Sequence, residues 1–215
     1  MTDLPFAAVP AVTDRLADAM DIEGKIPRAL ATLGLEPGRP AAVLDVPATP
    51  WVDRVRRVAP EALVVPAIEP GGDLTVPVPD GSLASLVTLW TGFRGITGAG
   101  LDEVDRVLEP DGRLLVVHDY GRDDVSRLRP ADAPEYRSWS RRDGPFLRGG
   151  GFRIRVIHCF WTFADLDAAR EGLAALGPAG EELGSTLKRS RLSWNVAVYH
   201  RRHGGAPPPE AAAPG

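Results

Sequence analysis

The order of the apolar segments predicts an α/β protein with a doubly wound, mostly parallel sheet. Two observations lead to this fold class. Short apolar runs, at 41–46 and 83–90, are typical of strands that are buried on both faces of a parallel sheet. Segments with helical periodicity, at 51–58 and 101–108, separate such runs, and strands that alternate with helices form parallel βαβ units.

The amino-terminal segment, residues 1–40, precedes the first apolar run and is expected to form a helical cap. It contains two helical patterns, at 12–20 and 22–33. Gly34 follows the second pattern, at the position where helices commonly end. We expect the α/β domain to span residues 41–203.

Within this domain, the second strand is predicted at 62–68 and contains Pro66. A proline cannot donate a hydrogen bond to a neighbouring strand, so this strand is expected at an edge of the sheet or to be interrupted. The next segment, 69–82, consists of turn-forming residues and has no room for a helix of normal length.

The second half of the chain continues the alternation and ends in a strand that no helix follows. The expected elements are a strand at 113–118, a helix at 134–147, a long strand at 152–163, helices at 165–176 and 179–188, and a last strand at 192–200. Residues 204–215 are rich in proline, alanine and glycine, which predicts a disordered tail.

Composition narrows the classes of function. The 25 basic residues against 29 acidic residues give a net charge of -4, which argues against a surface built for nucleic acid or anionic lipid. No apolar stretch approaches the roughly 18 residues of a membrane span, and no secretory signal is evident. Cys159 is the single cysteine, so an intrachain disulfide is excluded. We therefore expect a cytoplasmic protein without a membrane partner.

Two sequence blocks carry a resemblance to a known family. The first is Val76-Pro77-Val78-Pro79-Asp80-Gly81-Ser82 leading into the run 83–90, and the second is the helix, turn and strand at 101–120. Together they resemble the class I S-adenosylmethionine-dependent methyltransferases, of the methyltransferase type 11-like kind. The resemblance covers about residues 26–200. It implies a Rossmann-like fold with a carboxyl-terminal antiparallel strand, S-adenosylmethionine as cofactor, and a small-molecule methyl acceptor.

The resemblance also implies a cofactor site at the carboxyl ends of the strands, near the topological switch point. The residues that match the family's cofactor positions are Asp45, Val46, Pro47, Glu69, Asp73, Trp90 and Thr91. A carboxylate such as Glu69 suits the two hydroxyls of a ribose, because it accepts two strong hydrogen bonds. The alternatives are that Asp45 caps a turn, that Glu69 and Asp73 are solvated turn acids, and that Trp90 is a core residue.

One loop departs from the family pattern. Family members carry a glycine-rich loop after the first strand, where backbone N–H groups approach the cofactor. This chain has Pro47-Ala48-Thr49-Pro50 instead, and each proline removes one backbone donor. The cofactor loop is degenerate by this comparison.

Candidate reacting groups follow two later strands. Phe93 and Arg94 match positions near the acceptor, where a guanidinium could hold an anionic group. His118, Asp119 and Tyr120 are the candidate catalytic residues, with His118 as a general base if the acceptor must lose a proton. Adjacent residues of a strand point to opposite faces, so His118 and Asp119 need not touch, and a structural histidine is the alternative.

Two hypotheses follow. The first is a methyltransferase that uses S-adenosylmethionine, and the second is a catalytically inactive methyltransferase-like scaffold that serves as a binding or regulatory module. The motif order favours the first, and the prolines of the degenerate loop favour the second. A metal site is not expected, because the remaining histidines lack ligand spacing. The arginines and aromatic residues at 136–155 are interpreted as a solvated helix face and one side of a strand, with nucleic-acid contact as the alternative.

Overall fold

The structure is a computed structural model that describes residues 10–44, 49–65, 74–90, 98–129, 141, 143–144, 146–147 and 150–205. Its strands are β1 (Ala41–Leu44), β2 (Leu63–Val65), β3 (Leu83–Leu89), β4 (Leu108–Asp119), β5 (Arg153–Thr162) and β6 (Arg191–Arg202). Its helices are α1 (Pro10–Ala19), α2 (Lys25–Leu33), α3 (Thr49–Arg56), α4 (Gly98–Val107), the 3-10 helix η1 (Val125–Leu128), α6 (Leu166–Ala174) and α7 (Pro178–Thr186). Most of the helix expected at 134–147, and residues 206–215 of the expected tail, lie outside the described residues.

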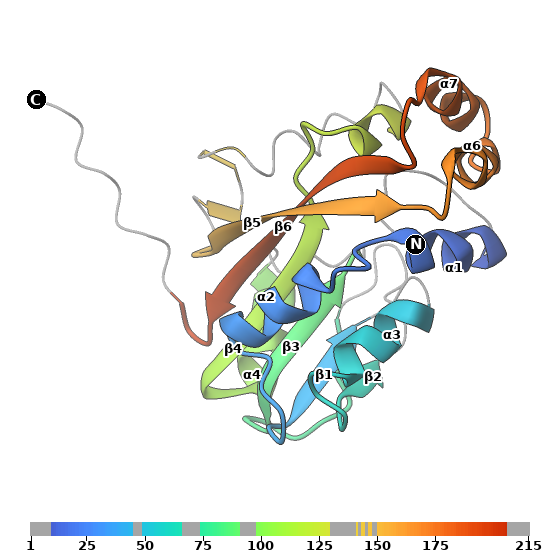
Figure 1. The fold of residues 1–215 in the computed structure, drawn as a ribbon. Helices are drawn as coiled ribbons and strands as arrows, with labels where there is room; N and C mark the ends of the chain where they lie inside the picture. Colours follow the sequence, from blue (N-terminus) through green and yellow to red (C-terminus); the bar gives the residue numbers. More distant parts are fainter. Residues whose placement is uncertain are drawn as a thin grey trace, which may run out of the picture.

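The strands form one sheet in the order β2-β1-β3-β4-β6-β5 (Figure 1). β1 pairs in parallel with β2 and with β3, and β3 pairs in parallel with β4. β6 is antiparallel to both β4 and β5. The sheet is therefore mostly parallel with an antiparallel carboxyl-terminal strand, as predicted. β2 lies at the edge of the sheet, which confirms the expectation from Pro66.

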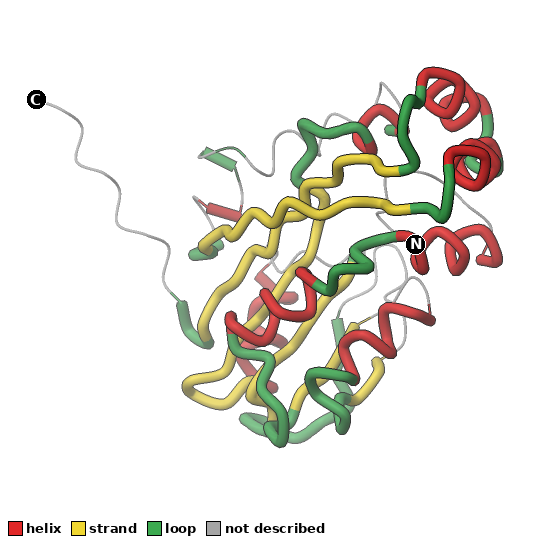
Figure 2. Tube along the Cα trace, in the orientation of Figure 1, coloured by secondary structure: helices red, strands yellow, loops and turns green. Residues whose placement is uncertain are grey.

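The helices cover both faces of the sheet, so the fold is doubly wound. Trp51 and Val55 of α3 belong to one hydrophobic cluster, together with Val87 of β3. Val104 and Val107 of α4 belong to the cluster on the opposite face. Figure 1 shows α2 and α3 in front of the sheet and α4 behind it, and the tube of Figure 2 follows the same path. The direction of winding thus reverses between the neighbouring strands β1 and β3, which defines the topological switch point.

The two amino-terminal helices share the core of the sheet. Leu16 and Met20 of the α1 segment and Ile26 and Leu30 of α2 lie in the same buried cluster as Trp51. Their apolar spacing is that of helices with one face against a core. The expected helical cap therefore packs directly onto the face that α3 also covers.

The start of α2 shows why sequence periodicity placed it too early. Helix α2 begins at Lys25 instead of residue 22, because Asp21 turns the chain with a φ of 48°. The two carboxylate oxygens of Asp21 accept hydrogen bonds from the backbone N–H groups of Lys25 at 2.9 Å and Ile26 at 2.7 Å. A side chain that satisfies the first free N–H groups of a helix stabilises that helix start.

Strand β4 is longer than the sequence predicted. Its pairing with β3 steps from Leu83↔Leu108 to Ser85↔Arg113, so the expected turn at 109–112 forms an irregularity inside the strand and does not precede it. Gly112 is required there, because a Cβ atom would lie 2.9 Å from the carbonyl oxygen of Glu109.

Among the described residues, no helix has the length and apolar character needed to cross a bilayer.

Candidate functional site

The switch point places the carboxyl ends of β1 and β3 side by side, with Leu44 in register with Thr88. Trp90 follows β3 at this edge and has a φ of 50°, in the left-handed region that a bulky side chain rarely adopts. Its backbone N–H donates to the carbonyl oxygen of Val117 at 3.1 Å, which continues the pairing with β4. The strained backbone turns the indole of Trp90 into the core, where it is 0% exposed.

Four tryptophans meet beneath this edge. We call Trp51, Trp90, Trp161 and Trp194 the tryptophan cluster, and all four are buried. The ring of Trp90 stacks on Trp194 with centroids 5.3 Å apart and lies 4.8 Å from the tilted ring of Trp51. Aromatic pairs at such separations add to the free energy gained by burial. Trp90 is therefore a core residue, the alternative that the sequence left open.

The carboxylate of Asp119 organises the tryptophan cluster from the end of β4. Its Oδ1 accepts hydrogen bonds from Nε1 of Trp194 at 2.8 Å and Nε1 of Trp90 at 3.2 Å. Its Oδ2 accepts a hydrogen bond from the guanidinium of Arg129 at 2.5 Å. Burial raises the pKa of Asp119, while the charge of Arg129 acts in the opposite direction. Both carboxylate oxygens are thus engaged, so this side chain positions two indoles and an arginine.

The other two candidate catalytic residues lie apart from that network. His118 is 1% exposed and alternates with Asp119 along β4, which places it on the face of Leu114 and Val116. The structure therefore separates His118 from Asp119, as the alternation rule indicated. Tyr120 is half-buried, and its backbone N–H donates to the carbonyl oxygen of Asn195 at 2.8 Å.

The loop after β4 is fixed to β6 by two neighbouring carboxylates. Asp123 accepts a hydrogen bond from the backbone N–H of Asn195 at 2.7 Å. Asp124 accepts from the backbone N–H of Ser193 at 2.8 Å and from its hydroxyl at 2.7 Å. These contacts hold the segment after Tyr120 in place, so the carboxyl end of β4 has one defined geometry.

Most predicted cofactor and acceptor residues lie outside the described residues. They are Asp45, Val46, Pro47, Glu69, Asp73, Thr91, Phe93 and Arg94. Their roles stay predictions. Sequence reasoning missed Trp194 and Arg129, which the fold brings to Asp119, and Trp51, which packs against Trp90 and Trp194. Trp51 carried a usable signal, since a large aromatic residue two positions into a helix after the first strand is well placed to face the sheet.

A cleft of about 740 Å³ opens between α1, the α1–α2 connection and α3. Its lining is mainly charged and comprises Asp14, Asp18, Asp21, Ile22, Gly24, Pro27, Pro50, Asp53, Arg54 and Arg57. Arg54 donates to the carbonyl oxygens of Met20 at 2.6 Å and Ala17 at 2.7 Å, and its guanidinium lies 4.5 Å from the ring of Trp51. The cleft thus follows α3 from Pro50, near its start, to Arg57, just past its end.

The fold and its switch point define a doubly wound α/β protein with a carboxyl-terminal antiparallel strand pair. No family model and no curated protein matches the chain. Solved structures that resemble it include a SAM-dependent methyltransferase from Aquifex aeolicus, with 13% identity over 90% of this chain and 98% of that chain and a TM-score of 0.48. A second is a SAM-dependent methyltransferase from Thiobacillus denitrificans in complex with S-adenosyl-L-homocysteine, with 13% identity, coverage of 90% and 99%, and a TM-score of 0.40. A third is geranyl diphosphate C-methyltransferase from Streptomyces coelicolor A3(2), with 10% identity, coverage of 84% and 81%, and a TM-score of 0.42.

Proposed function

We propose that this chain is an S-adenosylmethionine-dependent methyltransferase that acts on a small-molecule acceptor in the cytoplasm. The observation that carries the proposal is the reversal of winding between β1 and β3. In open α/β sheets, ligands bind outside the carboxyl ends of the strands at such a reversal. The two sequence blocks at 76–90 and 101–120 agree with this placement, because they contribute β3 and β4, two strands whose carboxyl ends lie at this edge.

The proposed cofactor site is built from three strand ends. Asp45, Val46 and Pro47 follow β1, Glu69 and Asp73 follow β2, and Thr91 follows β3 next to the buried Trp90. Carboxylates suit the ribose hydroxyls and the amino group of such a cofactor. Pro47 and Pro50 leave fewer backbone donors after β1 than a glycine-rich loop has, so the fit rests on the carboxylates.

The bound cofactor would supply a methyl group on a positively charged sulfur. The chain's own residues then have two tasks. Asp119 holds the indole of Trp90 in the floor of the site, which fixes the end of β3. Phe93 and Arg94 are proposed to orient the acceptor, and His118 or Tyr120 to remove its proton where the acceptor has one to lose.

Calorimetric titration of the full chain with S-adenosylmethionine and S-adenosylhomocysteine tests the proposal. Asp45→Ala and Glu69→Ala should each weaken binding by about 1 to 3 kcal/mol, because each removes a charged acceptor. Glu61→Ala is the matched control, since Glu61 is exposed and lies at the start of β2, away from the carboxyl edge. Absence of binding at millimolar ligand would refute the methyltransferase proposal.

A second candidate is a catalytically inactive scaffold that binds a partner or regulates one. The observation that favours it is the sealed tryptophan cluster, in which Trp90 is buried and Asp119 is fully engaged. An inactive scaffold predicts that Trp90 variants change stability without any effect on the affinity for S-adenosylmethionine. A methyltransferase predicts that Trp90→Phe, which keeps an aromatic ring, alters that affinity because the end of β3 shifts.

A further inference from the structure

Five basic side chains gather at the opposite edge of the sheet, where β4 and β5 begin and β6 ends. We call this set the basic face, and it comprises Arg113, Arg153, Arg155, His200 and Arg202. The strand register brings them together, because Arg113 is directly opposite Arg202 and Arg153 is directly opposite His200. Directly opposite residues of antiparallel strands have Cβ atoms about 5 Å apart.

The strand periodicity puts all five side chains on one face of the sheet. On β6, His200 and Arg202 alternate in phase with the buried Val196 and Val198, which belong to the core cluster under α2. On β5, Arg153 and Arg155 are in phase with Ile157 of the same cluster. The face is therefore apolar where α2 covers it and basic where α2 ends.

The arginines of the basic face have no anionic partner within the part of the chain that the structure describes. Several other arginines of the protein have a carboxylate partner. Arg201, the neighbour of Arg202 on the other face, donates to both carboxylate oxygens of Asp105 at 2.8 and 2.9 Å. Like charges directly opposite each other in a sheet are destabilising, so the pair of Arg113 and Arg202 carries an electrostatic cost that a bound anion would relieve.

The charge of this region also affects its histidine. Burial lowers the pKa of His200, and the nearby charges of Arg113, Arg153 and Arg155 lower it further. His200 is therefore an uncharged hydrogen-bonding group among cations at neutral pH.

A hollow of about 240 Å³ adjoins the basic face. Its lining residues are Gly34, Glu36, Arg39, Ala84, Asp111, Arg113 and Arg202. Of the two acids, Glu36 lies 3.8 Å from Arg39, whose guanidinium also pairs with Glu109. Asp111 is the remaining acid, so the hollow contains three guanidiniums, of Arg39, Arg113 and Arg202, and two carboxylates. Its volume is below the roughly 300 Å³ at which sites for larger organic ligands begin.

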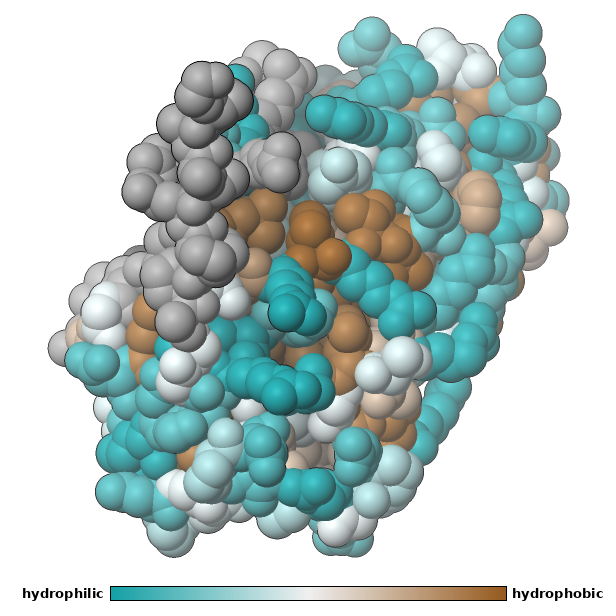
Figure 3. All heavy atoms as spheres, turned by 90° about the vertical axis from the view of Figure 1, so that its left-hand side faces the viewer, coloured by the Kyte–Doolittle hydropathy of each residue, from teal (hydrophilic) through white to brown (hydrophobic). Residues whose placement is uncertain are grey.

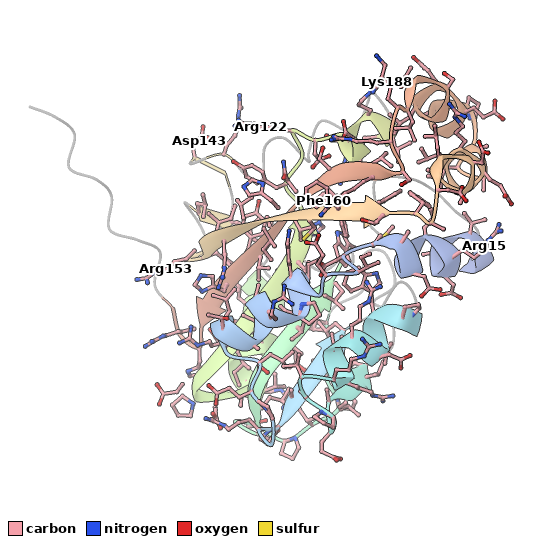
Figure 4. All side chains as sticks on the ribbon, viewed as in Figure 1. Arg15, Arg122, Asp143, Arg153, Phe160 and Lys188 are labelled. Carbon is pink, nitrogen blue, oxygen red and sulfur yellow. The ribbon has the colours of Figure 1, made fainter. Side chains whose placement is uncertain are left out.

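We propose that the basic face binds a compact anion with two or more phosphate groups. Guanidiniums bind phosphate oxygens through paired hydrogen bonds, and several adjacent guanidiniums favour a ligand with several adjacent negative groups. The basic face contains no phenylalanine, tyrosine or tryptophan, and the imidazole of His200 is half-buried, which disfavours bases that stack. The site is separate from the carboxyl edge: Figure 4 shows Arg153 at the far end of β5 from α6. Figure 3 shows the side of the molecule on which β5 begins, with many hydrophilic side chains beside a hydrophobic area.

Calorimetric titration of the full chain with inorganic triphosphate, at low salt and again at physiological salt, tests this proposal. We expect binding that weakens as salt is added. The double variant Arg153→Gln/Arg202→Gln should weaken it by about tenfold or more, because two charged donors are lost. The matched control is Arg15→Gln/Arg56→Gln, which removes two exposed arginines from α1 and α3 and should change the affinity less than about twofold.

Thermal unfolding gives a second measurement. Triphosphate should raise the unfolding temperature of the wild type and of the control, and not that of the Arg153→Gln/Arg202→Gln variant. If Arg153→Gln/Arg202→Gln fails to fold, Arg155→Gln takes its place, and an affinity of Arg155→Gln for triphosphate equal to that of the wild type would overturn the proposal. Three further outcomes would overturn it: no binding at millimolar triphosphate, equal weakening in both double variants, or tight binding of a DNA duplex without binding of triphosphate. The last would show that the face binds a polyanion surface in place of a compact ligand.

Discussion

Asp119 at the end of β4 accepts a hydrogen bond of 2.8 Å from the indole Nε1 of Trp194 on β6. The two residues lie on neighbouring antiparallel strands: Asp119 is in register with Val196, and Trp194 lies two residues before Val196 on β6. The carboxylate of Asp119 also accepts hydrogen bonds from Trp90 and Arg129. It therefore specifies how the aromatic residues pack beneath the proposed cofactor site.

The first prediction concerns the removal of this carboxylate. Asp119→Ala leaves two buried indole N–H groups without their acceptor and removes one partner of Arg129, and should reduce the free energy of unfolding by about 3–5 kcal/mol. Asp102→Ala, at an exposed position of α4, should change it by less than about 0.5 kcal/mol. Urea denaturation measures both, and similar values for the two variants would show that the network contributes little.

The second prediction concerns the aromatic packing itself. Trp51→Ala removes a ring that is 1% exposed and contacts Trp90, so it should cost about 3–5 kcal/mol of unfolding free energy. Val52→Ala, the half-buried next residue of α3, should cost less than about 1.5 kcal/mol. Chemical denaturation followed by far-ultraviolet circular dichroism measures these losses. A cost for Trp51→Ala below that of Val52→Ala would contradict the structure.

The third prediction concerns α1. Arg54 of α3 donates to the carbonyl oxygens of Ala17 in α1 and of Met20 just after it, and so ties the end of α1 to α3. Arg54→Gln should therefore accelerate amide hydrogen exchange in residues 10–19 and lower the unfolding free energy by about 1–3 kcal/mol. Arg56→Gln, on the exposed side of the same helix, should leave exchange in α1 unchanged. Equal exchange in both variants would contradict the proposed role of Arg54.

The fourth prediction is a pH dependence. Burial raises the pKa of Asp105, but hydrogen bonds from Arg201 and from the backbone of Gly204 outweigh it, so the pKa lies below the ordinary value of 3.8. A carboxyl group whose pKa is depressed by folding stabilises the protein above its unfolded pKa, and this contribution is lost as the pH falls through the folded pKa. Asp105→Asn should therefore cost more unfolding free energy near neutral pH than below about pH 3. A cost that is the same at both pH values would show that the ion pair with Arg201 does not supply it.

The sequence predicted the order of strands and helices well, because apolar runs and helical periodicity are local signals. The edge position of β2 followed from Pro66 in the same way. The boundaries of α2 and β4 were less accurate, since the Asp21 cap and the irregularity at 109–112 depend on contacts with other segments.

The candidate site was harder to predict than the fold. Trp90 and Asp119 were selected as separate functional residues, and their hydrogen bond to each other depends on the pairing of β3 with β4. Trp194 and Arg129 join them from 75 and 10 residues away in the chain. Contacts at such separations have no local signal. Of the basic face, only Arg153 and Arg155 lie in the stretch 136–155 that the sequence singled out, because its members are scattered over three strands and only the register assembles them.

The most direct test of the central claim is hydrogen–deuterium exchange of the full chain with and without S-adenosylmethionine. A cofactor site at the switch point predicts slower exchange in peptides that cover 41–56 and 83–97, and unchanged exchange in the basic face around Arg113 and Arg202. Exchange that is unaltered at saturating S-adenosylmethionine, or slowed only in the basic face, would contradict a cofactor site between β1 and β3.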